Sequence, residues 1–183
     1  MPDPAPGPLR LVQSFVNALS ASREAPDLPA TLSASREAAD LLATREEAAA
    51  WLRAAALLPA ESGLSGSEHA ALLRLREAVR NSLAAHTGGR DDSEAASRLT
   101  KALAEGRLVV TVDPASSVQL ASAARASYPG VVAAIAVAIA EAAAAGTWLR
   151  LKFCSGSACG QAFYDNSAAA GAQGCDTHVA QTG

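Results

Sequence analysis

Alanine makes up roughly a quarter of the 183 residues, and this composition favours a helical fold with a sparse core. Alanine is the best helix former, but its single methyl group buries little apolar area. The core must therefore rest on Leu, Val, Ile and a few aromatic residues. Because 50% of the residues are hydrophobic, the chain still has enough apolar material to fold, which excludes a disordered chain.

The larger apolar residues recur at helical spacing along most of the chain. Two capping boxes, Thr44 with Glu47 and Ser65 with Glu68, mark the starts of two helices. We expect five helices in all, at residues 9–20, 44–58, 65–87, 93–105 and 129–145.

The pattern changes after the fourth helix, where β-branched residues become frequent. Residues 108–112 and 117–121 flank an Asp-Pro turn signal and predict a β-hairpin. A further strand is expected at residues 147–153. The four prolines among the first eight residues predict an extended, mobile tail.

All three cysteines lie in the last thirty residues, where they form a pattern with a histidine. Cys154, Cys159, Cys175 and His178 read C-x4-C-x15-C-x2-H. Three thiolates and one imidazole are a common ligand set for structural Zn²⁺. Two other interpretations remain open, namely cysteines buried as small hydrophobic residues and a redox pair of Cys154 with Cys159. The expected fold class is mostly helical α+β, with about five helices, a small β-hairpin and a C-terminal zinc-ribbon-like module.

An aromatic stretch, F-Y-D-x-S, lies at residues 163–167 between the second and third cysteines. With the C-x4-C pair before it and the third cysteine after it, the segment resembles the CGNR-type zinc finger of bacterial stress-responsive transcriptional regulators. Residues 14–18 and 40–52 resemble helix motifs of that family's N-terminal ABATE domain. The resemblance implies a ligand-sensing domain at residues 1–146 and a finger module at residues 147–183.

The finger departs from the family pattern at its end. Ala180 stands where the family has its fourth cysteine, so His178 is either a substitute ligand or unrelated to the site. No Lys or Arg follows Lys152, while Asp165 and Asp176 add negative charge. Phosphates would be repelled, and no arginine could read guanine. We therefore expect DNA binding by the finger to be weak or absent.

Three residues of the helical domain are candidate contacts for an unknown small-molecule ligand. The resemblance suggests Asn17, for which a solvated or capping role is the alternative. Arg74 and Arg76 lie near Glu77 on the third expected helix, where exposed ion pairs are the alternative. The second function we consider is an interaction module without a DNA role, whose finger serves folding or the contacts of a homodimer.

Several other classes of function are disfavoured. Motifs for a nucleophile elbow, a phosphate-binding loop or H-E-x-x-H are missing, so we do not expect an enzyme. The formal net charge of −3 argues against a strongly basic nucleic-acid binder. Since the sequence shows neither a membrane-spanning apolar run nor a signal segment, we expect a cytoplasmic protein without a membrane partner.

Overall fold

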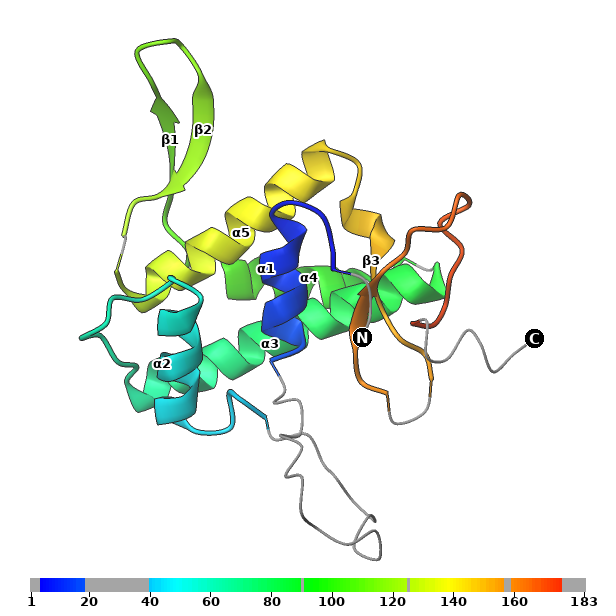
Figure 1. Ribbon diagram of the computed structural model, residues 1–183, viewed down its shortest axis with the longest axis horizontal. Coiled ribbons are helices and arrows are strands. Elements are labelled where there is room, and N and C mark those ends of the chain that lie inside the picture. Colours follow the sequence, from blue (N-terminus) through cyan, green and yellow to red (C-terminus); the bar gives the residue numbers. More distant parts are fainter. Residues whose placement is uncertain (1–3, 19–39, 90, 125, 157–158, 176–183) are drawn as a thin grey trace, which may run out of the picture.

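The computed structural model describes residues 4–18, 40–89, 91–124, 126–156 and 159–175. Within these ranges it contains five α-helices, a short 3-10 helix and two antiparallel hairpins (Figure 1). This confirms the mostly helical α+β fold. The elements are α1 (Leu9–Val16), α2 (Arg45–Ala54), α3 (Gly66–Gly88), α4 (Ser93–Leu103), β1 (Leu108–Val112), β2 (Val118–Ser122), α5 (Tyr128–Ala144), η2 (Trp148–Arg150), β3 (Leu151–Phe153) and β4 (Ala162–Tyr164).

Helices α2 and α3 begin at the two predicted capping boxes. The hydroxyl of Thr44 accepts a hydrogen bond from the Glu47 amide, and the Glu47 carboxylate accepts one from the Thr44 amide. Ser65 and Glu68 make the same reciprocal pair. At the far end of α3, Gly89 has a φ of +58°, which glycine adopts without strain, and the helix ends there.

The core lies around α1, which packs against both α5 and the long helix α3. Phe15, Leu75, Val79 and Ile135 are fully buried in it. Large aliphatic side chains thus supply the core, as an alanine-rich composition requires. Alanines such as Ala138 fill the remaining buried positions on α5.

Two parts of the N-terminal region differ from the prediction. The first helix ends at Val16 rather than at residue 20; the next residue, Asn17, leaves helical geometry, and its side chain bonds to strand β4. Residues 19 and 20 lie outside the described residues. The proline-rich start is also anchored from residue 4 onward. Ala5 is fully buried, and its N–H donates to the side-chain oxygen of Gln13 at 2.7 Å.

The two hairpins have different positions on the body. The β1–β2 hairpin projects away from the helices, with its base near α5 (Figure 1). The β3–β4 hairpin packs on α3, and Leu151 and Ala162 are fully buried members of the main core. Residues 148–150, expected as strand, form η2 instead, so β3 is only three residues long. The domain boundary at residue 146 stays a prediction.

Candidate metal centre

The β3–β4 hairpin carries two of the three cysteines. Cys154 follows β3 directly, and its N–H donates to the carbonyl of Gln161 at 2.8 Å, which continues the ladder by one bond beyond the strands. Cys159 lies three residues before β4. Cys175 arrives from the loop after β4, beside Ser155, whose N–H and hydroxyl both donate to the carbonyl of Gln173. The loop is therefore tied back onto the start of the hairpin.

The three cysteine sulfurs converge on one point. All three lie within 4.8 Å of one another, and the Sγ atoms of Cys159 and Cys175 are 3.6 Å apart. Cys154 and Cys175 are buried with Phe163 in a small apolar cluster that is separate from the main core. Three sulfurs at these distances can hold one metal ion.

Backbone N–H groups around the cluster favour the thiolate form of one cysteine, Cys154. Burial alone would raise the pKa of the Cys154 thiol, but the N–H groups of Cys175 and Gly156 donate to its sulfur and lower the pKa overall. Burial raises the pKa of Cys159 to about 12, with hydrogen bonds to the other two sulfurs adding to the shift. Binding of a metal ion at this site would therefore release protons from the thiols.

A buried ion pair holds the loop that brings in Cys175. The ammonium of Lys152 donates to Asp165 at 2.8 Å and to the carbonyls of Ala170 and Ala172. The Asp165 carboxylate also accepts bonds from Ser167 and from the Ala172 amide. Burial alone would raise the pKa of Asp165, but these donors hold it well below its usual value. The aspartate of the F-Y-D-x-S stretch is thus the organising centre of the loop.

This ion pair corrects the charge predicted for the finger. Counted from the sequence, Asp165 adds negative charge that would repel phosphates. Its side chain is 0% exposed and is paired with Lys152, so it presents no net charge to a partner. The lack of Lys and Arg after residue 152 remains. The sequence does contain a signal for the pairing of Lys152. It lies in the apolar run L-K-F before the first cysteine, and a lysine that is buried in such a run needs a partner of opposite charge.

Helix α3 fixes strand β3 through two side chains near its end. The Thr87 hydroxyl donates to the carbonyl of Phe153 at 2.7 Å and accepts from its N–H at 3.0 Å. The His86 ring nitrogen Nδ1 lies 2.9 Å from the carbonyl of Leu151. Burial lowers the pKa of His86, which favours the neutral ring. Both roles depend on contacts between residues about 65 positions apart, which sequence spacing does not reveal.

Asn17 fixes strand β4 in the same way. Its amide nitrogen donates to the carbonyl of Ala162, and its amide oxygen accepts from the N–H of Ala162, both at 2.7 Å. The side chain thus pairs with the strand as a neighbouring backbone would. The structure places Asn17 beside Ala162, at the end of the hairpin next to the loop that carries Cys154 and Cys159, where its side chain is bound to the protein itself.

Replacing Asn17 by alanine is expected to destabilise the fold by about 1–3 kcal/mol, because the N–H of the buried Ala162 loses its partner and its carbonyl keeps only the longer bond from Gln13. Urea unfolding followed by circular dichroism measures this loss. Asn81→Ala on α3 serves as the control, since no hydrogen bond of its amide is seen among the described residues, and it should change stability little. Equal effects of the two substitutions would contradict the assigned role of Asn17.

The structure places the three predicted ligand-binding residues in different surroundings. Arg76, expected in exposed ion pairs, is 8% exposed and makes a bidentate ion pair with Asp40, with both distances 2.6 Å. Arg74 is exposed on α3. Asn17 lies at Ala162, as described above. His178, the expected fourth metal ligand, lies outside the described residues.

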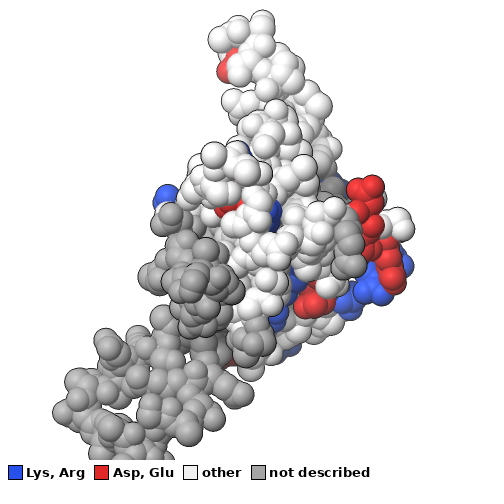
Figure 2. Space-filling view, turned by 90° about the vertical axis from the view of Figure 1, so that its right-hand side faces the viewer, with Lys and Arg blue, Asp and Glu red and all other residues white. Residues whose placement is uncertain are grey.

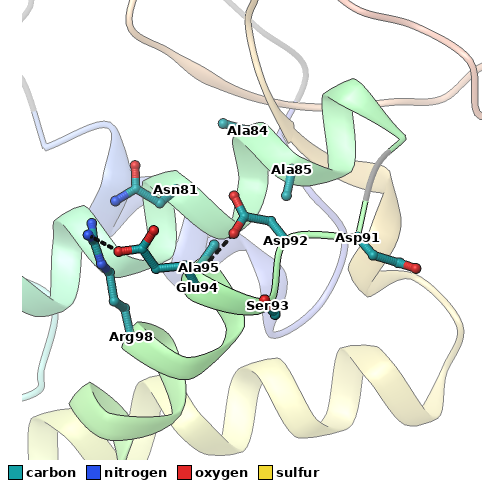
Figure 3. Close-up of a pocket in the computed structure, with 9 residues that line it drawn as sticks. All are labelled: Asn81, Ala84, Ala85, Asp91, Asp92, Ser93, Glu94, Ala95 and Arg98. Carbon is teal, nitrogen blue, oxygen red and sulfur yellow. Dashed lines mark hydrogen bonds and ion pairs between the residues drawn. The ribbon is translucent and has the colours of Figure 1, made fainter.

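A hollow in the described surface lies elsewhere, between α3 and the start of α4 (Figure 3). Its volume is about 580 Å³, and it is lined mainly by acidic and small residues. Asp92 caps α4 by accepting from the Ala95 amide, and Glu94 pairs with Arg98. These carboxylates are thus engaged within the protein. The hollow includes none of the three predicted ligand contacts.

Comparison with protein families gives a match for the helical part. The model of the ABATE family, described as "Putative stress-induced transcription regulator", matches residues 9–146, which is most of the chain. The match confirms the resemblance of the helical part, and the cysteine cluster fits the CGNR-type finger. No curated protein matches the chain. Among the described residues, no helix has the length and apolarity needed to cross a bilayer.

Proposed function

The chain belongs to the ABATE family of stress-induced transcription regulators, and we propose that it is a regulator whose finger holds a structural Zn²⁺ and contacts DNA weakly or not at all. The observation that carries this proposal is the convergence of three sulfurs on a hairpin that offers no cation to a phosphate. No catalytic step is part of the proposal.

Zinc fits the donor set better than other common metals. Thiolates are soft ligands that suit Zn²⁺, whereas Mg²⁺ and Ca²⁺ take oxygen ligands. Tetrahedral zinc with bonds of about 2.3 Å places its sulfurs roughly 3.8 Å apart, close to the 3.6 Å between Cys159 and Cys175. Cys154, Cys159 and Cys175 would hold the ion, with His178 as the fourth ligand. The bound ion would cross-link the hairpin to its following loop.

The surface around the hairpin supports weak DNA binding. On the face that carries this hairpin, most described residues are neither acidic nor basic (Figure 2). Lys152, the last cation of the chain, is buried against Asp165 and cannot reach a phosphate. Because phosphate contacts supply most of nonspecific affinity, a hairpin whose one lysine is buried has little to offer DNA.

Restoring cations tests this explanation. We expect the wild-type chain to bind random and promoter duplexes no more tightly than about 10⁻⁴ M at physiological salt. Ala168 and Ala169 are exposed in the loop between β4 and Cys175. The double substitution Ala168→Arg and Ala169→Arg should add salt-sensitive binding in fluorescence anisotropy, whereas Ala168→Gln with Ala169→Gln should not. Tight, salt-sensitive binding by the wild-type chain would contradict the proposal.

A small-molecule ligand for the helical domain is part of the same proposal. A ligand that bound at Asn17 would compete with Ala162 and loosen β4, so ligand binding and the metal site would be coupled. Arg74 is the expected contact that lies exposed.

The interaction module is the second candidate, and one observation favours it. The hairpin strands are built into the main core through Leu151 and Ala162, so the finger serves folding directly. A wild-type chain that binds no DNA, and whose arginine variant gains only nonspecific binding, would favour this second function over a regulator that reads DNA itself.

A further inference from the structure

The β1–β2 hairpin has an apolar face that no described residue covers. Val110 lies opposite Leu120, and Val112 lies opposite Val118. Because side chains alternate along a strand, these residues share one face with Leu108. Their exposed fractions are between 39% and 67%. We call this set, Leu108, Val110, Val112, Val118 and Leu120, the apolar ribbon face.

The opposite face of the same hairpin is different in character. Thr111 and Gln119 pair at its centre, with Val109 and Ala121 beside them. Apolar and more polar side chains therefore alternate along the hairpin, as in antiparallel sheets that bury one face and expose the other to water. A two-stranded hairpin is at best marginally stable alone in water. An uncovered apolar face on such an element indicates a binding surface.

The chemistry of the ribbon face favours a second copy of the chain as its partner. Neither strand contains a charged residue, and the projecting hairpin is almost free of charge in the space-filling view (Figure 2). In a twofold contact the same patch lies on both sides, so a charged residue near the axis would meet its own copy. An uncharged apolar face avoids that repulsion. Nucleic acid would need cations, which the strands lack.

The available area is also sufficient. The five residues expose roughly 450 Å² of mostly apolar surface, which is within the range of the largest patch on a typical monomer, a patch that is often functional. Packing two such faces together, with the flanking strand edges, would bury about 1,000 Å² in total, the lower bound for a specific interface. We propose that two chains associate across a twofold axis by packing their apolar ribbon faces together. This interface does not depend on the proposed function.

The test compares charges placed on the two faces of one hairpin. Val110→Glu with Val118→Glu puts two carboxylates on the apolar ribbon face, and Thr111→Glu with Gln119→Glu puts two on the opposite face. Sedimentation equilibrium of the zinc-loaded full chain, over about 1 to 100 µM, gives the mass and the dissociation constant. Far-UV circular dichroism shows that each variant is folded.

We expect the wild-type chain to sediment at twice its 18.4 kDa mass. The ribbon-face variant should dissociate at least about 100-fold more readily, because four buried carboxylates would meet in the dimer. The opposite-face variant should remain dimeric. Hydrogen exchange of residues 108–122 should slow as wild-type concentration rises.

Two results would overturn the proposal. One is a wild-type chain that stays monomeric throughout the concentration range, including a monomer that floats with phosphatidylcholine vesicles and so uses the face for lipid. The other is a dimer that both variants weaken equally, since the contact would then lie elsewhere than on the apolar ribbon face.

Discussion

Replacing Cys175 by serine is expected to reduce the bound zinc from about one ion per chain to none. Cys175 supplies one of three converging sulfurs and is the only one from the loop after β4. A serine hydroxyl has a similar shape but does not ionise near neutral pH. Because the cluster around the sulfurs is small, the metal should contribute most of the local stability; structural zinc contributes about 10–16 kcal/mol in zinc-finger peptides.

Metal analysis of protein purified without chelator measures the zinc content, and thermal unfolding with and without chelator measures its contribution to stability. The wild-type melting temperature should fall with chelator, and that of Cys175→Ser should not respond. Gln173→Ala is the matched control, since its exposed side chain lies two residues before Cys175 and the substitution keeps all three sulfurs and the backbone carbonyl that Ser155 binds. A metal-free wild-type chain with three reactive thiols would rule out the zinc site.

His178 needs a separate measurement because three sulfurs could hold a metal without it. Cobalt substitution reports ligand type through its absorption bands. If His178 is the fourth ligand, His178→Ala should change the ligand-field bands while the thiolate charge-transfer band keeps its intensity.

Breaking the buried ion pair should have the second-largest effect. Lys152→Met leaves the Asp165 carboxylate buried without its cation, and such a loss costs about 3–5 kcal/mol. The two side chains are 5% and 0% exposed, so solvent cannot replace the missing partner. The variant should also bind zinc more weakly, because Lys152 holds the carbonyls of Ala170 and Ala172 just before Cys175.

An exposed pair provides the control for this substitution. Arg45 and Glu46 are also 2.8 Å apart, but their side chains are 52% and 71% exposed. Arg45→Met should therefore change the free energy of unfolding by less than about 1 kcal/mol. Equal effects of Lys152→Met and Arg45→Met in urea unfolding would show that the buried pair has no special role.

The pH dependence of the same pair has a defined sign. Since the pKa of Asp165 is lowered in the folded state, its stabilising contribution is fully present above the unfolded value of about 3.9. It is lost progressively as pH falls from there toward the folded pKa. The stability difference between the wild-type chain and Asp165→Asn should therefore be constant near neutrality and shrink in acid.

Local signals in the sequence predicted most of the secondary structure. The capping boxes at Thr44 and Ser65 and the glycine after α3 act through bonds between residues three or four apart, so their partners are visible in the sequence. The cysteine spacing likewise pointed to a cluster, and the three sulfurs do converge. The side chains that hold the hairpin in place could not be found this way, because Asn17 and Ala162 are 145 positions apart.

The sequence by itself determined a helical fold with an aliphatic core, a cysteine cluster, and a finger without cations after residue 152. Only the tertiary structure decided how polar residues are used. Asn17 and Arg76 bond within the protein, and Asp165 is neutralised by Lys152 rather than exposed. The reason is physical. A polar side chain that is buried loses its hydrogen bonds to water and must bond to another group of the protein. That group can lie at any distance along the chain, so the sequence alone does not identify it.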